Sequence, residues 1–118
     1  MTLNEFVQAA KKGPVAFTDT MDIVTAHYSY APSGFYNGVD SSRFYNEAGT
    51  NEGSCKLFAF AKLNGLDQQA TLHCFGDYYV VDVLQHADGT DHQNIRTFMV
   101  SGWDGIGFDT KVLSLNPA

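Results

Sequence analysis

The segment NEAGTNEGSCKLFAFA, Asn46 to Ala61, decides how we expect the rest of the chain to be arranged. Its first ten residues contain two Asn-Glu pairs, two glycines and a Ser-Cys pair, and an apolar run with helical spacing follows at once. The first amides of a helix have no partner inside the helix, so a polar, turn-rich segment that leads into a helix can hold a binding or reactive group. We therefore place the candidate functional residues at this junction.

Capping residues predict where the first three helices begin. Thr2-Leu3-Asn4-Glu5 is a capping box for the first helix, and the second is expected to begin near Thr18 or Asp19. Ser54 is a preferred N-cap residue, which predicts that the third helix runs from Cys55 to about Asn64.

Glycines and polar residues delimit two further helices. Asp67 is predicted to cap a fourth helix, and Gly76 in its middle either bends it or lets another backbone come close. A second capping box, Thr90-Asp91-His92-Gln93, is predicted to begin the fifth helix, which Gly102 ends.

Short strands are expected in the glycine-rich segments. Gly34 to Gly38 predicts one strand, while residues 106–108 and 112–114 predict two more that turn at Asp109-Thr110. Five helices and an antiparallel sheet of two or three strands give an α-dominated α+β fold. The length of 118 residues predicts one domain over residues 1–118.

Composition excludes several classes of protein. The chain has 13 Asp and Glu against 7 Lys and Arg, a net charge of −6, and no basic stripe, so nucleic-acid binding is not expected. No apolar run approaches the roughly 20 residues of a membrane-spanning helix, and the N-terminus lacks the pattern of a Sec signal. Two cysteines without a CxxC spacing predict free thiols in a reducing compartment.

A thiol site is the most specific chemical hypothesis that the sequence offers. Cys55 is expected in the first turn of its helix, where the helix dipole lowers a thiol pKa. His92 and Asp91 would supply a base and the carboxylate that orients it, as in a Cys-His-Asp hydrolase or transferase. The alternative is that Cys55 is a buried apolar residue and His92, on one face with Ile95 and Met99, a hydrogen-bonded core histidine.

Polar residues around both helix starts form a second candidate set, for ligand binding. These residues are Asn46, Glu47, Asn51, Glu52, Asn94 and Arg96. Arg96 is expected to reach Glu47 or Glu52, because Asp91 lies five positions away and outside the usual intrahelical spacing. We favour a structural role for the polar cluster, in which Asn46, Glu47, Asn51 and Glu52 tie the long loop to helix N-termini and turn amides.

A metal site and an aromatic binding surface complete the alternatives. Carboxylates and one histidine suit a divalent cation, and the candidate ligands are Glu47, Glu52, Asp91, His92 and His27. Because the chain lacks HExxH, EF-hand and zinc-finger spacings, we expect no metal and no cofactor. A protein-binding surface would instead use the aromatic residues that crowd the region after the second helix, which are Tyr28, Tyr30, Phe35, Tyr36, Phe44 and Tyr45.

Three blocks of sequence carry a family resemblance. NEAGTNEGSCKLFAFAKLNGL, TLHCFGDYYVVDVL and GTDHQNIRTFMVSGW followed by GIGFD, together with HYSYAPSGFYNG, resemble the HopJ family of bacterial type III effector proteins over nearly the whole chain. The resemblance implies a virulence-related protein made in the bacterial cytoplasm and secreted into a host cell. It implies no agreed catalytic activity. We therefore expect a domain that binds a host or bacterial protein, with a small enzyme built on Cys55, His92 and Asp91 as the alternative.

Overall fold

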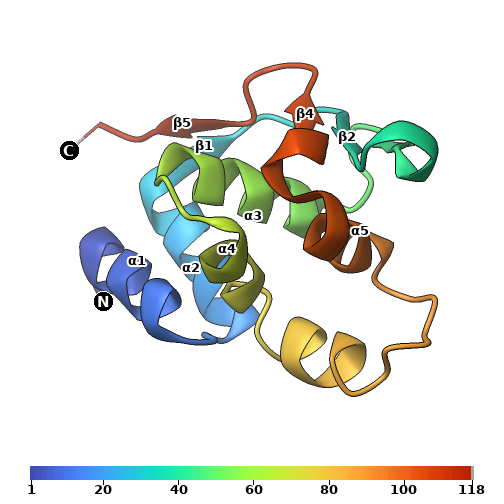
Figure 1. Cartoon of the computed structure of the whole chain (residues 1–118). Coiled ribbons are helices and arrows are strands. Elements are labelled where there is room, and N and C mark those ends of the chain that lie inside the picture. The colour runs from blue at the N-terminus through green and yellow to red at the C-terminus, as the bar shows by residue number, and fades with distance from the viewer. Residues whose placement is uncertain (118) are drawn as a thin grey trace.

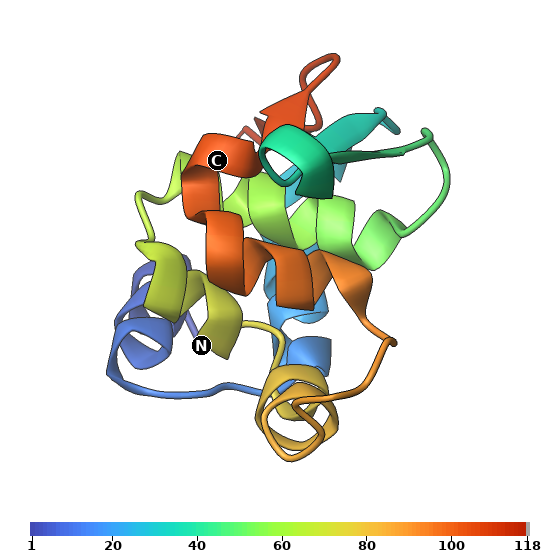
Figure 2. The same cartoon turned by 45° about the vertical axis from the view of Figure 1, so that its right-hand side comes forward.

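The computed structural model describes residues 1–117 and confirms the helix-dominated α+β fold (Figure 1). Its five α-helices are α1 (Leu3–Lys12), α2 (Phe17–His27), α3 (Glu52–Leu63), α4 (Gln68–His73) and α5 (Gln93–Ser101). A π-helical segment, η2 (Tyr78–Val83), and two 3-10 helices, η1 (Asp40–Ser42) and η3 (Gly102–Gly105), complete the helical part. Figures 1 and 2 show the strands gathered at one end of the molecule and η2 at the other.

The strands form two small antiparallel sheets. In one, β1 (Tyr28–Tyr30) pairs with β5 (Leu113–Leu115); in the other, β2 (Phe35–Asn37) lies between β3 (Phe44–Asn46) and β4 (Gly107–Phe108). The strand predicted between Gly34 and Gly38 is confirmed as β2.

The predicted hairpin of residues 106–108 and 112–114 is wrong, because β4 and β5 pair with different strands. The segment between them finds its partners in residues 31–34. Asp109 N–H donates to the Gly34 carbonyl at 3.0 Å, and the Val112 carbonyl accepts from Ala31 at 2.8 Å. These bonds hold the segment along the loop before β2, so it cannot close a tight turn on itself.

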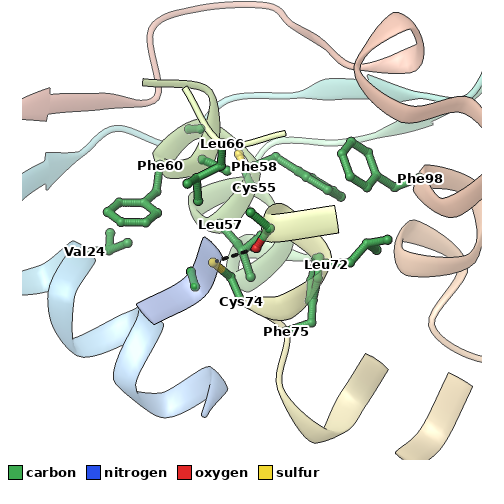
Figure 3. Close-up of a cluster of buried hydrophobic side chains, with 14 of the residues drawn as sticks. Val24, Cys55, Leu57, Phe58, Phe60, Leu66, Leu72, Cys74, Phe75 and Phe98 are labelled. Atoms are coloured by element: carbon green, nitrogen blue, oxygen red, sulfur yellow. Dashed lines mark hydrogen bonds between the residues drawn. The ribbon is translucent and has the colours of Figure 1, made fainter. Parts of the chain in front are cut away.

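The core is built around α3, whose residues Cys55, Leu57, Phe58, Ala59, Phe60 and Ala61 are all buried. Side chains from α2, α4 and α5 pack around this helix in a cluster of aliphatic and aromatic residues (Figure 3). The Phe58 ring, for example, lies 4.9 Å from that of Phe98 and 5.5 Å from that of Phe75, measured between ring centroids. Burial on every side explains why this stretch is apolar all round.

The two N-terminal helices follow the sequence prediction closely. Thr2 Oγ1 accepts from Glu5 N–H at 3.1 Å and Glu5 Oε1 accepts from Thr2 N–H at 2.9 Å, which confirms the first capping box. Helix α2 begins at Phe17, one residue before the expected start. It ends at His27, so Tyr28, predicted on its inner face, instead begins β1.

Gly76 divides the predicted fourth helix. Helix α4 ends at His73, and Gly76 has a φ of +60°, which favours glycine, before the chain continues as η2. A Cβ atom at this position would lie 2.6 Å from the Val15 carbonyl oxygen and 2.9 Å from the Phe17 nitrogen. The glycine therefore both breaks the helix and lets another backbone come close.

Candidate functional site

The starts of α3 and α5 both have a left-handed N-cap residue. Asn51 (φ 49°, ψ 43°) precedes α3 and His92 (φ 50°, ψ 48°) precedes α5, and neither side chain caps the helix amides. An N-cap side chain reaches those amides from an extended backbone, and a left-handed backbone removes it from them. The predicted cap at Ser54 and the capping box at Thr90-Asp91-His92-Gln93 are therefore wrong, and Ser54 lies inside the first turn of α3.

A network of asparagines, all of them buried except Asn51, joins these two helix starts. Asn94 Nδ2 donates to Asn46 Oδ1 at 2.9 Å, and Asn46 Nδ2 donates to Asn94 Oδ1 at 3.2 Å. Asn51 Nδ2 also donates to Asn46 Oδ1, at 2.7 Å. Asn37, absent from the predicted set, donates to both oxygens of Asn94 at 3.0 Å. The sequence could have indicated Asn37, because it lies two positions after Phe35 on the same strand and its side chain therefore points to the same face.

A cleft of about 390 Å³ opens beside this network. Three predicted site residues, Asn51, His92 and Asn94, line it together with Ser54 and Gln93. Its remaining walls are mainly aromatic and come from Phe17, Phe44, Phe75 and Tyr78. The structure thus brings part of the predicted ligand-binding set together in a cleft that both polar side chains and aromatic rings line.

Glu47 and Glu52 do not take part in this cleft. Both are exposed, neither lines the cleft, and neither contacts Arg96 in an ion pair within residues 1–117. The predicted pairing of Arg96 with Glu47 or Glu52 is therefore wrong.

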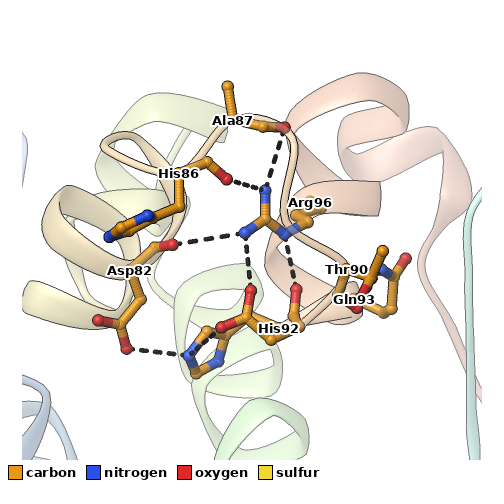
Figure 4. A network of polar contacts seen from close by, with 8 residues as sticks. Asp82, His86, Ala87, Thr90, His92, Gln93 and Arg96 are labelled. Atoms are coloured by element: carbon orange, nitrogen blue, oxygen red, sulfur yellow. Dashed lines mark hydrogen bonds and ion pairs between the residues drawn. The ribbon is translucent and has the colours of Figure 1, made fainter.

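Arg96 instead holds the loop that precedes α5 (Figure 4). Its Nε and Nη2 donate to the Asp91 carbonyl at 2.6 Å and to Asp91 Oδ1 at 2.7 Å. Its remaining N–H groups point at the carbonyls of Asp82, His86 and Ala87, at 3.0 to 3.4 Å. Asp91 lies before the helix, so the intrahelical spacing rule does not apply to this pair.

The contact between Arg96 and Asp91 affects the pKa of the carboxylate and occupies the donors of the guanidinium. The hydrogen bond from Arg96 holds the pKa of Asp91 below its ordinary value. All five guanidinium N–H groups of Arg96 have partners, which leaves none for a ligand.

His92 lies at the rim of the cleft and pairs with a residue that the sequence did not indicate. Its Nε2 is 3.0 Å from Asp82 Oδ2 and 3.8 Å from Asp91 Oδ2, and its ring centroid is 5.3 Å from that of Tyr78. The side chain is 30% exposed, so it is a partly accessible histidine at a helix start.

Cys55 lies in the core, away from the cleft lining. It is 1% exposed, and its Sγ donates to the Ser33 carbonyl at 3.6 Å. Burial is the largest effect on the thiol and raises the pKa of Cys55 to about 11. Helix α3 begins three residues earlier than predicted, so the Cys55 amide already bonds to the Asn51 carbonyl.

No hydrogen bond within residues 1–117 joins Cys55 to His92 or Asp91. The Cys55–His92–Asp91 site therefore stays a prediction, and the geometry gives it no support. Cys74 is buried in the same core (Figure 3), and burial raises its pKa to about 12. Within residues 1–117, no group of three His, Cys, Asp or Glu side chains is placed to hold a metal ion.

Two of the predicted aromatic residues form an exposed pair on β2 and β3. Tyr36 and Tyr45 are direct cross-strand partners, 36% and 44% exposed, with ring centroids 4.8 Å apart. The Arg43 guanidinium carbon lies 3.9 Å from the centroid of the Tyr36 ring. We call Tyr36, Tyr45 and Arg43 the tyrosine patch.

The neighbouring strand leaves the tyrosine patch uncovered, and a hydrogen bond holds one of its rings in place. On the other side of Tyr36 its partner on β4 is Gly107, which has no side chain to cover the ring. Tyr45 Oη donates to Asp109 Oδ2 at 2.5 Å, and this bond raises the pKa of Tyr45 to about 12. Tyr28 and Phe35 from the same predicted set belong to the core.

The family described as HopJ type III effector protein matches residues 3–113. This chain belongs to the HopJ family. The crystal structure of a protein of unknown function, VPA0580, is similar to the HopJ domain described above, with 46% identity and a TM-score of 0.91. The similarity covers 98% of this chain and 95% of that one. No curated protein sequence matches the chain.

The match confirms the resemblance seen in the sequence. Within residues 1–117, no helix is both long and apolar enough to cross a membrane.

Proposed function

We propose that this HopJ domain acts as an effector by binding a protein, and that a type III system delivers it into a host cell where that protein resides. Membership of the effector family supports the delivery. The observation that supports binding is the exposed tyrosine patch of Tyr36, Tyr45 and Arg43.

The composition of the tyrosine patch is that of a binding hot spot. Tyr and Arg are among the residues that contribute most to the free energy of protein association. Arg43 forms no ion pair and no side-chain hydrogen bond within residues 1–117, so its guanidinium donors are available to a partner. These features favour a contact surface over a solvated strand face.

The patch is also held in one arrangement before binding. The two rings contact each other across the strands, with their planes tilted by 52°, and the bond to Asp109 holds Tyr45 at its hydroxyl. A partner would then lose little side-chain entropy in ordering these residues, which improves affinity.

Site-specific photo-crosslinking tests the proposal. With p-benzoylphenylalanine at position 36, the protein in infected or transfected host cells is expected to form a discrete covalent adduct with a host protein. The same probe at position 100, where Val100 is 84% exposed on α5, serves as the control. Equal crosslinking from both positions, or no adduct from position 36, would contradict the proposal.

A further inference from the structure

A second surface of this HopJ domain is an apolar groove between the end of α3 and the segment that joins β4 to β5. It has a volume of about 400 Å³. Ala59 and Leu63 form its α3 wall, and Phe108, Val112 and Leu113 form the opposite wall. Leu63 is 56% exposed, so a large aliphatic side chain stands open to solvent there.

Two lysines line the groove, one from each wall. Lys62 comes from α3 and Lys111 from the segment before β5, and both are exposed. Lys62 Nζ lies 5.8 Å from the centroid of the Phe108 ring. Neither lysine forms an ion pair within residues 1–117, so both ammonium groups are available to an incoming anion.

The charge of the groove is opposite to that of the protein. The chain carries 13 acidic and 7 basic residues, yet no carboxylate lines this groove. Asp109, adjacent along the chain, accepts the hydrogen bond from Tyr45 on the tyrosine patch. Near the groove the two lysines would therefore attract an anionic segment, while the net negative charge of the chain would repel it from other surfaces.

We propose that this groove binds an acidic peptide segment that carries apolar side chains. A peptide presents carboxylates on both sides of an apolar residue, and this arrangement matches lysines on both walls of an apolar groove. A simple amphiphile has an anionic group at one end only and would leave one lysine unused. The groove shares no residue with the tyrosine patch, so this inference goes beyond the proposed function and can fail independently of it.

Fluorescence anisotropy with two labelled peptides tests the inference. One peptide has two leucines flanked by glutamates, and the other has the same leucines flanked by glutamines. The glutamate peptide is expected to bind at least about tenfold more tightly, by an advantage that shrinks as salt is added. Equal affinity for the two peptides, or no binding of the glutamate peptide at millimolar concentration, overturns the proposal.

Charge-reversal variants locate the binding. Lys62→Glu with Lys111→Glu is expected to weaken binding of the glutamate peptide at least about tenfold. Lys11→Glu with Lys12→Glu changes the net charge equally at the exposed end of α1 and is expected to leave the affinity within about twofold. Equal weakening by both pairs would show a response to net charge and overturn the proposed site.

The apolar wall has a matched test as well. Leu63→Ala is expected to weaken binding of the glutamate peptide about threefold or more, because apolar contact is lost. Val100→Ala, at an exposed position outside the groove, is expected to leave this affinity unchanged. Both positions are exposed, so the fold tolerates either change. If decanoate displaces the peptide and binds more tightly than it, the groove is a small-molecule site and the peptide proposal is wrong.

Discussion

Asn46 and Asn94 hydrogen-bond each other in both directions across 48 positions of the chain, at 2.9 and 3.2 Å. The pair ties the end of β3 to the first turn of α5, and both residues are buried. It fixes the loop that leads into α3 and one side of the cleft. The polar segment that begins at Asn46 is thus held in place by Asn94, in the first turn of α5.

We expect Asn46→Ala and Asn94→Ala each to lower the free energy of unfolding by about 1–3 kcal/mol, because each removes both bonds of the pair from a buried network that keeps only part of its other bonds. The double variant is expected to cost less than the sum of the two, with a coupling of about 0.5–3 kcal/mol. Urea unfolding of the four proteins measures this cycle. Asn4→Ala, at an exposed position in α1, is the control, and strictly additive effects at Asn46 and Asn94 would contradict the account.

Arg96→Lys is expected to destabilise the protein by about 1.5–3 kcal/mol, because an ammonium cannot reach the carbonyls that the guanidinium fork holds. Amide hydrogen exchange in residues 86–91 should accelerate in the same variant. Arg43→Lys makes the same replacement at an exposed stacked position and should cost less than about 1 kcal/mol. Similar losses in the two variants would mean that Arg96 does not hold this loop.

Both cysteines should react slowly with iodoacetamide in the folded protein at neutral pH. With a pKa of about 11 for Cys55 and about 12 for Cys74, the thiolate fraction of either is roughly one part in ten thousand or less. Denaturant should expose both thiols to rapid labelling. Fast labelling of native Cys55 alone, measured by mass spectrometry of its peptide, would instead support the thiol enzyme.

Stability at high pH should depend on the bond from Tyr45 to Asp109. The folded state raises the pKa of Tyr45 from 10.0 to about 12, so between these values the folded protein retains a proton that the unfolded chain has lost. The contribution is complete below pH 10 and is lost as the pH rises toward 12. Asp109→Asn should therefore flatten the fall of the unfolding free energy over this range, measured by urea titration at several pH values. An unchanged slope would contradict the assignment.

The sequence predicted which helices form better than it predicted the residue at which each helix begins. Thr2 and Asp67 cap α1 and α4 as expected, because their side chains act within one turn. Asn51 and His92 were missed, since a left-handed backbone at a non-glycine residue depends on contacts from distant segments. The earlier start of α3 that results places Cys55 beyond the free amides that the thiol hypothesis required.

Long-range partners explain the other differences. Arg96 was assigned to a glutamate because Asp91 lies outside the usual intrahelical spacing, but Asp91 precedes the helix and does pair with Arg96. The other acceptors of Arg96 are backbone carbonyls, which no sequence pattern displays. The expected turn at Asp109-Thr110 failed because its backbone bonds to residues 33 and 34. The separation of buried Phe35 from exposed Tyr36, by contrast, follows from strand alternation once β2 is recognised.

The central claim is that the tyrosine patch, and not Cys55, mediates the function of this HopJ domain. Calorimetric titration of the crosslinked partner into variants of the purified domain tests this claim most directly. Tyr36→Ala with Tyr45→Ala is predicted to weaken binding by about thirtyfold or more, and Cys55→Ala to leave it within about threefold. Retention of full affinity by the double tyrosine variant, with loss of affinity in Cys55→Ala, would contradict the account.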